Sequence, residues 1–207
     1  MPKTLDRLDL RKQLKQFYTA AAAPAVVDLP PMSYLMVDGQ GDPNTSADYA
    51  AAIGALYGVS FTLKFTFKRG PERVDYKVMP LEGLWWADDM ASFVRGDRAK
   101  WHWTAMIMQP DFVTRTHVDA AIAAAGLKRP NEMLGKLRLE RFAEGRAAQL
   151  LHTGPYSAEA PNIEKLHAFI AEQGGKLSGR HHEIYLSDPR RVAPERLKTI
   201  IRQPFAT

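Results

Sequence analysis

A strand pattern near the end of the chain combines an apolar face with a chemically active one. In the segment HHEIYL, Ile184 and Leu186 fall on one face and His181, Glu183 and Tyr185 on the other, because successive strand residues alternate. The apolar face is expected to pack on a helix. The other face places a carboxylate beside an aromatic ring, which suits a flat, cationic or polarised organic molecule and raises the pKa of a glutamate toward neutrality. An edge strand with a solvated face would have the same pattern.

The rest of the chain divides into extended and helical patterns. Strands are expected where apolar and polar residues alternate between turn residues. Helices are expected where apolar residues recur three or four positions apart, after a capping residue where one is present. In chain order, these patterns predict an arm helix over 5–18, a strand over 25–37 broken at Pro30-Pro31, a helix from Ser46, strands over 74–79 and 101–108, a helix from Thr114 to Gly126, a hairpin of 136–142 with 146–153, a helix from Pro161 to Gly174, and a last short helix from Pro194.

One stretch in the first half of the chain is ambiguous. Apolar residues alternate with Thr and Lys from Phe61 to Phe67, which favours a strand. Yet Tyr57, Phe61 and Phe65 also fall four residues apart, as on one face of a helix. Gly58 weakens a helix here by about 1 kcal/mol. The local pattern therefore favours the strand.

The order of elements repeats along the chain. Strand, polar turn, helix and strand occur at 34–79 and again at 147–186, although the two halves share negligible sequence identity. Two such units side by side would make one continuous antiparallel sheet with helices on one face. The uncovered face would then form a groove between the halves. That groove is expected to receive Glu183 and Tyr185, together with one of Trp85 and Trp86.

The composition narrows the class of protein. Hydrophobic residues make up 45% and charged residues 25% of the 207 residues, which is ordinary for a globular protein with a substantial core. No apolar run reaches bilayer length and the N-terminus lacks a signal-peptide core, so we expect a cytoplasmic protein without membrane contact. There is no cysteine, which excludes disulfides and thiol chemistry. The net charge of +5 is dispersed, so direct nucleic-acid binding is not expected.

Two short motifs resemble cofactor or metal sites but fail on their context. Gly39-x-Gly41 starts like a dinucleotide fingerprint, but its sixth position is Asn44 and no parallel strand-helix-strand unit follows. His182-Glu183 lacks the second His four residues on, and it lies in a strand. The scattered histidines fit surface or core-edge positions better than a metal site. We therefore expect neither a metal nor a cofactor.

Aromatic residues gather near the predicted strands. Trp85 and Trp86 must point to opposite faces if they are extended, whereas Trp101 and Trp103 share one face. Met108 adds adaptable apolar surface of the kind that promiscuous pockets use. A pocket needs only two or three aromatics and one carboxylate, since each cation–π contact contributes about 0.5–2 kcal/mol. Ordinary core packing accounts equally well for at least half of these residues.

Several segments together resemble a known family. The chain is similar to the stand-alone GyrI-like small-molecule-binding proteins in the segments GQGDPN at 39–44, PLEGLWW at 80–86, MQPDF at 108–112, HTGPY at 152–156 and HEIYLSDPR at 182–190. The likeness runs from about Asp9 to Phe205. The family is similar to the effector-binding domains of multidrug-sensing regulators. Their helix-turn-helix is not expected here, because too few residues precede Tyr34.

The resemblance implies a fold and a division of the chain. The fold is α+β, with duplicated strand-helix-strand-strand units that form a pseudo-symmetric antiparallel sheet, helices on one face and a ligand groove on the other. The resemblance also implies that Ser46–Lys68 is mostly one helix. We therefore expect an arm helix within 1–24 and a single domain over 25–207, with repeats at about 25–110 and 130–207, in a monomer.

The resemblance further implies a ligand class. Such proteins bind bulky planar hydrophobic, often cationic, small molecules between the repeats, with a glutamate matching Glu183 as the polar anchor. The role would be sequestration or detoxification of multidrug or xenobiotic compounds. The ligand contacts expected in this chain are Glu183, Tyr185, Tyr156, Trp85, Trp86, Trp103, Glu82 and Met108.

Two alternatives stay open. Some proteins that this chain resembles are hydrolases that open the cyclopropane ring of DNA-alkylating natural products. In that reaction Glu183 would be the general base and Tyr156 the proton donor, with His152 or His181 assisting. The other alternative is a gyrase-inhibitor-like module that binds another protein.

Overall fold

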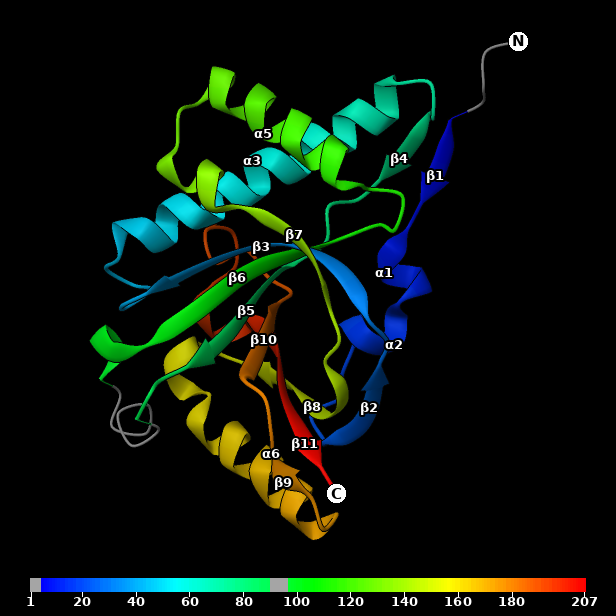
Figure 1. Cartoon of the computed structure of the whole chain (residues 1–207). Helices are drawn as coiled ribbons and strands as arrows, with labels where there is room; N and C mark the ends of the chain where they lie inside the picture. Colours follow the sequence, from blue (N-terminus) through cyan, green and yellow to red (C-terminus); the bar gives the residue numbers. More distant parts are fainter. Residues whose placement is uncertain (1–4, 90–96) are drawn as a thin grey trace. The chain divides into compact units, whose positions relative to one another are not determined.

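The computed structural model describes residues 5–89 and 97–207. The chain divides into two compact units, and each unit is assembled from separate stretches of the sequence (Figure 1). Unit 1 consists of Met1–Gln13, Met32–Met79 and Ala87–Phe142, and unit 2 consists of Leu14–Pro31, Pro80–Trp86 and Ala143–Thr207.

Unit 1 combines an antiparallel sheet with two helices. The middle strand, β3 (Met32–Gln40), pairs with β6 (His102–Gln109) on one side and with β7 (Arg138–Phe142) on the other. The helix α3 (Ala47–Arg69) packs on β3 and β6, and α5 (Arg115–Lys128) packs on α3. The remaining described elements of unit 1 are β1 (Asp6–Leu8) in parallel with β4 (Val74–Tyr76), α1 (Leu10–Gln13), and the 3-10 turns η1 (Arg98–Lys100) and η2 (Glu132–Lys136).

The stretch with the ambiguous pattern is part of α3. Ser46 caps the helix as predicted, since its hydroxyl accepts a hydrogen bond from a backbone N–H in the first turn. Leu63 and Phe67 are buried, whereas Phe61 and Phe65 are 45% and 40% exposed. The two members of each pair are four residues apart and so lie on the same face of the helix. The alternation in the sequence therefore reflects one buried and one exposed helix face. The local strand prediction was wrong, and the long helix implied by the resemblance is confirmed.

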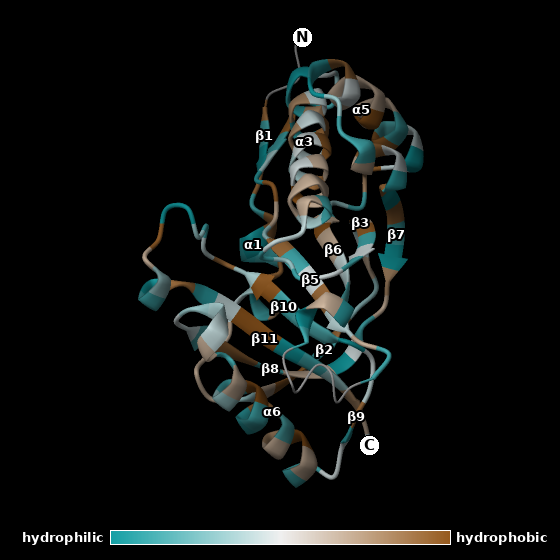
Figure 2. Ribbon diagram, turned by 90° about the vertical axis from the view of Figure 1, so that its left-hand side faces the viewer, coloured by the Kyte–Doolittle hydropathy of each residue, from teal (hydrophilic) through white to brown (hydrophobic). Residues whose placement is uncertain are grey.

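Apolar residues occur along much of α3 (Figure 2). Among the described residues, α3 is the one helix that is long enough and apolar enough to cross a membrane, judged by length and composition alone. Core helices of soluble proteins pass the same test. Cytoplasmic localisation stays a prediction.

Unit 2 is built on an antiparallel sheet of five strands. Their order across the sheet is β2 (Ala25–Leu29), β8 (Gly145–Thr153), β11 (Lys198–Ala206), β10 (His181–Tyr185) and β5 (Leu81–Trp86). The other described elements are α2 (Lys15–Tyr18), α6 (Ala160–Glu172), β9 (Lys176–Leu177) paired with β11, and the 3-10 turns η3 (Tyr156–Ala158) and η4 (Pro194–Arg196).

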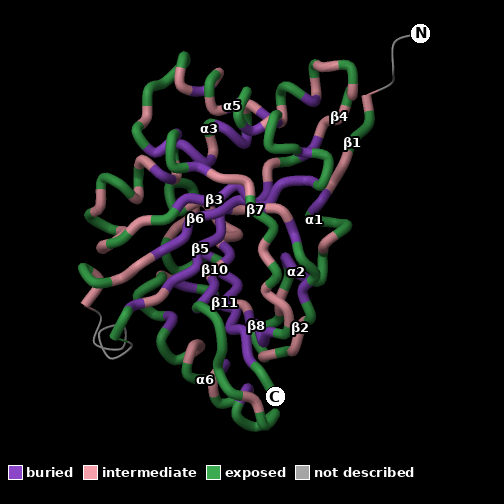
Figure 3. The backbone as a smooth tube through the Cα atoms, in the orientation of Figure 1, coloured by how far each residue is buried: buried purple, intermediate pink, exposed green. Residues whose placement is uncertain are grey.

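The helix α6 lies along β8 and β11 and covers the apolar core of unit 2 (Figure 1). Its residues Leu166 and Ile170 are fully buried and pack with residues of the two strands. Figure 3 shows the consequence: β10 and β11 are largely buried, while the outer side of α6 is exposed. The strand contribution to this core is Ala148, Leu150, Ile201 and Phe205.

The fold class is confirmed as α+β with antiparallel sheets, and the repeat is visible in the pairing. The strand β3 precedes α3 and pairs with β6, and β8 precedes α6 and pairs with β11. The strand β5 comes from the first half of the chain but pairs with β10 from the second half, within unit 2.

Three further local predictions were wrong: those of the hairpin, the last helix and the arm helix. The expected hairpin does not form, because β7 pairs with β3 while β8 pairs with β2 and β11. The last helix is limited to η4, and the following run with β-branched residues forms β11 instead.

The single arm helix also does not form. Residues 1–4 lie outside the described residues, and the rest of the expected helix consists of β1 and the single turns α1 and α2. The physical reason is that β1 takes its backbone hydrogen bonds from β4, while Phe17 and Tyr18 are buried in unit 2.

Candidate ligand-binding site in unit 2

The register of the unit 2 sheet decides which face Glu183 occupies. Glu183 lies opposite Ile201 of β11, and Ile201 lies opposite Leu150 of β8. Directly opposed residues in an antiparallel pair share a face. Because Leu150 and Ile201 pack under α6, Glu183 lies on the helix-covered face. The prediction that Glu183 would point away from the helices was therefore wrong.

The carboxylate of Glu183 accepts hydrogen bonds from two neighbours on β10. His181 Nε2 lies 3.2 Å from Glu183 Oε1, and Tyr185 Oη donates to Glu183 Oε2 at 2.7 Å. Trp85 Nε1 in turn donates to Tyr185 Oη at 3.1 Å. These contacts confirm the predicted face of His181, Glu183 and Tyr185, and they fix the orientation of the carboxylate.

A second carboxyl group, which the sequence analysis missed, belongs to the same cluster. Glu159 directly precedes α6, is 4% exposed, and lies close enough to Glu183 for the negative charge of Glu183 to raise its pKa. Its Oε1 atom has no hydrogen-bond partner among the described residues. The available sequence signal was an acidic residue just before a helix, close to Tyr156.

The pKa values of the two carboxyl groups are shifted in opposite directions. Burial and then the negative charge of Glu183 raise the pKa of Glu159 to about 10. Burial by itself also raises the pKa of Glu183, but the hydrogen bonds from His181 and Tyr185, together with the charge of His181, hold it below its usual range. The pKa of Glu183 is thus shifted downward, opposite to the expectation, and the raised pKa belongs to Glu159.

Aromatic rings surround this carboxyl pair. Tyr156 is 38% exposed and packs edge-on against Tyr185, with ring centroids 5.6 Å apart. Gly83 of β5 makes room for Trp85, because a Cβ atom there would lie 2.7 Å from Trp85 Nε1 and 3.1 Å from the hydroxyl of Tyr185. The structure thus brings Glu183, Tyr185, Tyr156 and Trp85 together.

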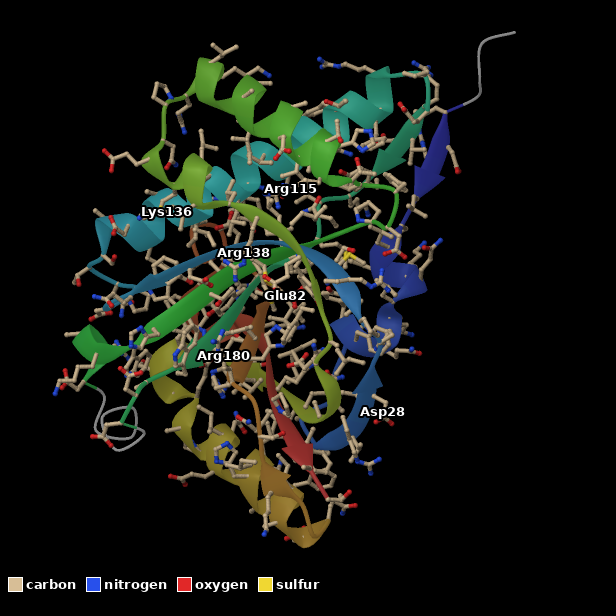
Figure 4. The ribbon with its side chains drawn as sticks, in the orientation of Figure 1. Asp28, Glu82, Arg115, Lys136, Arg138 and Arg180 are labelled. Carbon is tan, nitrogen blue, oxygen red and sulfur yellow. The ribbon has the colours of Figure 1, made fainter. Side chains whose placement is uncertain are left out.

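The opposite face of β10 holds a buried ionic network. His182 Nδ1 lies 2.8 Å from Glu144 Oε1, and its Nε2 lies 2.9 Å from Glu82 Oε2. Tyr18 Oη donates to the other oxygen of Glu82 at 2.8 Å, and Arg202 donates to Glu144 at 3.1 Å. Glu82, labelled in Figure 4, is fully buried, and both of its oxygens already take part in hydrogen bonds. Neither oxygen is therefore available to a ligand, contrary to the expectation that Glu82 is a ligand contact.

His182 is charged in this network. An ionised carboxylate only accepts hydrogen bonds, so each ring nitrogen must carry a proton. Burial lowers the pKa of His182, but Glu144 and Glu82 outweigh this and raise it above its usual value. The same neighbours, His182 and Arg202, hold the pKa of Glu144 below its usual range against the effect of burial.

The other predicted contacts lie elsewhere. Trp86 follows Trp85 on β5 and stacks under the guanidinium of Arg180, 3.5 Å from its ring centroid (Figure 4 labels Arg180). Trp103 and Met108 belong to unit 1, where both are buried and Trp103 packs edge-on against Tyr49.

Comparison with known proteins identifies the family. The chain matches the model of the GyrI-like small molecule binding domain over residues 22–205. It belongs to this GyrI-like family. No curated protein matches the chain.

Solved structures have the same fold. An uncharacterized conserved protein from Listeria innocua is 38% identical, with a TM-score of 0.90, and the match covers 96% of this GyrI-like chain and 100% of that chain. A hydrolase from Listeria innocua is 37% identical, with a TM-score of 0.87, over 97% of this chain and 100% of that one. The EcmrR C-terminal domain is 13% identical, with a TM-score of 0.56, over 89% and 97% of the two chains, and this likeness concerns the fold alone.

Proposed function

We propose that this GyrI-like protein binds bulky planar hydrophobic molecules, often cationic, at the Glu159–Glu183 cluster, for sequestration or detoxification. The observation that carries the proposal is the carboxyl group of Glu183, placed among the rings of Tyr185, Trp85 and the half-exposed Tyr156. A ring can stack on these aromatics while its positive charge lies near Glu183, and each cation–π contact contributes about 0.5–2 kcal/mol. Micromolar affinity corresponds to about 8 kcal/mol.

Dye binding tests this proposal. Quenching of tryptophan fluorescence is measured with ethidium, a planar cation, and with Nile red, a neutral ring system. Glu183→Gln should weaken ethidium at least tenfold and leave Nile red within about twofold, because only the cation interacts with the charge. Glu164→Gln, an exposed position on α6, is the matched control. Equal weakening of both dyes would contradict the anchor role of Glu183.

A second candidate function is hydrolysis, favoured by the opposite pKa shifts of Glu159 and Glu183. Two titratable groups whose environments push their pKa values apart form an acid–base pair. A relative 37% identical to this chain is a hydrolase. We propose cyclopropane-containing DNA-alkylating compounds as the substrate class.

The residues have defined roles in such a ring opening. Glu183 takes a proton from water, the water oxygen bonds to the ring methylene, and the ring C–C bond breaks. Its electron pair moves to the conjugated carbonyl oxygen, which is protonated by Glu159 or, as expected from the sequence, by Tyr156. Loss of one acid–base group typically costs about 10²–10⁴-fold in rate.

Turnover of a cyclopropane substrate, followed by the change in its chromophore, separates the two functions. Glu183→Gln should lower kcat by about 10²–10⁴-fold with little change in substrate affinity. Glu159→Gln and Tyr156→Phe then show which group donates the proton. Equal turnover by the wild type and Glu183→Gln would leave binding as the function.

A further inference from the structure

The helix α3 of unit 1 has an exposed face with little polarity along most of its length. Only 39% of its most apolar 18-residue window is buried, so packing inside the protein accounts for less than half of this window. The exposed residues at the centre of the face recur every three or four positions, which places them on one line along the helix. This line, called the α3 face below, consists of Ala47, Ala50, Gly54, Gly58, Phe61, Phe65 and Arg69.

The second half of the α3 face carries large side chains. Phe61 and Phe65 are both nearly half exposed, and the ring of Phe61 stacks on Tyr57 with centroids 6.2 Å apart. The guanidinium of Arg69 lies 5.1 Å from the ring centroid of Phe65. Aromatic residues and arginine are the side chains that protein interfaces concentrate and that contribute most to their affinity.

The first half of the α3 face carries small residues that packing within the described part of the chain does not require. A Cβ atom at Gly58 would have nothing within 4 Å outside the adjacent part of the helix. At Gly54 it would lie 3.6 Å from Nδ2 of Asn131, an ordinary contact. Glycine disfavours a helix interior, so these two positions weaken α3 without a benefit inside the chain. Close approach of another molecule would account for them.

We propose that the α3 face is the contact surface between two copies of this chain, whose α3 helices pack antiparallel about a twofold axis. The small residues are spaced four positions apart and the large residues are spaced in the same way, so the two series match when one helix is reversed. Each large side chain then lies against a small residue. The opposed pairs are Gly58 with the partner's Phe61, Gly54 with the partner's Phe65, and Ala50 with the partner's Arg69.

Charge complementarity favours a second copy over an anionic membrane as the occupant. Asp48 is exposed at the start of α3 and Arg69 is exposed at its end. In the antiparallel register Asp48 is about 3 Å along the helix axis from the position opposite the partner's Arg69. One ion pair therefore forms at each end of the contact. A face that binds anionic lipid would carry several cations, whereas the small half of the α3 face carries none.

The proposed dimer is weak. Two facing helices of 23 residues make a small interface, so we expect a dissociation constant on the order of 10–100 μM, in place of the monomer expected from the sequence. Sedimentation equilibrium over protein concentrations that span this range should show the average mass rising from that of one chain toward that of two.

Substitutions on the α3 face locate the contact. Phe65→Glu should raise the dissociation constant by about tenfold or more, because it places a charge where an aromatic ring is buried. Gly58→Leu should also weaken the dimer, because it fills the space that receives the partner's Phe61. The matched control is Leu127→Glu on α5, which changes a 91% exposed apolar residue outside the α3 face and should leave the dissociation constant unchanged. Thermal unfolding shows whether each variant retains its fold.

Charge reversal tests the register. Asp48→Arg and Arg69→Asp should each weaken the dimer several-fold, because each places like charges together. The double variant restores opposite charges at both ends and should recover the affinity of the wild type. A double variant as weak as the single ones would overturn the antiparallel register.

Cross-linking tests the direction of the helices, since the chain has no cysteine of its own. In the antiparallel register the two copies of Gly58→Cys lie about 4.5 Å apart along the helix axis, whereas those of Ala50→Cys lie about 28 Å apart. A short bis-maleimide should therefore link Gly58→Cys and not Ala50→Cys. Equal linking of both would indicate parallel helices and overturn the proposal.

Other outcomes also overturn it. The mass of a single chain at every concentration would exclude the dimer. A dimer that persists in both Phe65→Glu and Gly58→Leu would use another surface. Flotation of a single-chain protein with phosphatidylglycerol vesicles, lost in Phe65→Glu, would assign the α3 face to a membrane surface instead.

Discussion

The two faces of β10 carry similar residues in different chemical states. On one face, His182 is enclosed by Glu82 and Glu144, and Arg202 and Tyr18 complete their hydrogen bonds. On the other, Glu183 accepts hydrogen bonds from His181 and Tyr185 and lies near the carboxyl group of Glu159, beside the half-exposed ring of Tyr156.

The difference lies in charge balance and completeness. The network of Glu82, Glu144, His182 and Arg202 contains two carboxylates and two cations, so its formal charge is zero. Arg202 also donates to the backbone carbonyl of Phe17 at 2.6 Å, which ties α2 to the sheet. In the part of the chain that the structure describes, Oε1 of Glu159 has no hydrogen-bond partner. A complete network is suited to hold structure, and an incomplete one to receive a ligand.

The largest expected effect comes from breaking the balanced network. Arg202→Met removes one of the two cations that pair with the buried carboxylate of Glu144. Removing one partner of a buried ion pair typically lowers the free energy of unfolding by about 3–5 kcal/mol. Chemical denaturation should show a loss of that size in the free energy of unfolding. Arg196→Met, at an exposed position, should change the stability by less than about 0.5 kcal/mol. Equal losses would contradict a special role for the network.

Glu159→Gln should have the opposite sign and stabilise the protein. The raised pKa of Glu159 stabilises the fold below the unfolded pKa, near 4.5, and this contribution is lost as pH rises toward about 10. At pH 7 the wild type has lost on the order of 3 kcal/mol, which a neutral glutamine avoids. The gain in unfolding free energy should grow with pH and disappear near pH 4.5. A pH-independent gain would contradict the raised pKa of Glu159.

Tyr185→Phe removes one hydrogen bond from the incomplete cluster. The hydroxyl donates to a charged carboxylate, so its loss should cost about 1.5 kcal/mol and raise the pKa of Glu183. Tyr76→Phe is the control, because the buried hydroxyl of Tyr76 has no partner among the described residues. Its removal should be neutral or stabilising in the same thermal unfolding experiment. Equal losses would mean that the Tyr185 hydroxyl contributes nothing specific.

The smallest effect is expected where the guanidinium of Arg180 lies over Trp86. Exposed cation–π contacts contribute about 0.5–1 kcal/mol, so Arg180→Ala should lower the unfolding free energy by that amount. Ethidium affinity should not change, because Trp86 lies on the face opposite to Trp85 and Glu183. A change in ethidium affinity would show that the two faces are coupled.

By itself, the sequence determined the α+β class, the helix start at Ser46, the cluster of His181, Glu183 and Tyr185 on one strand face, and, through the resemblance, the family. These depend on caps and on alternation within a strand, which are local. The tertiary structure alone decided that β5 pairs with β10, that Glu183 shares the face of α6, and that the pKa of Glu159 is raised. Strand partners and burial are set by residues far apart in the chain, and a pKa depends on both, so no local pattern could supply them.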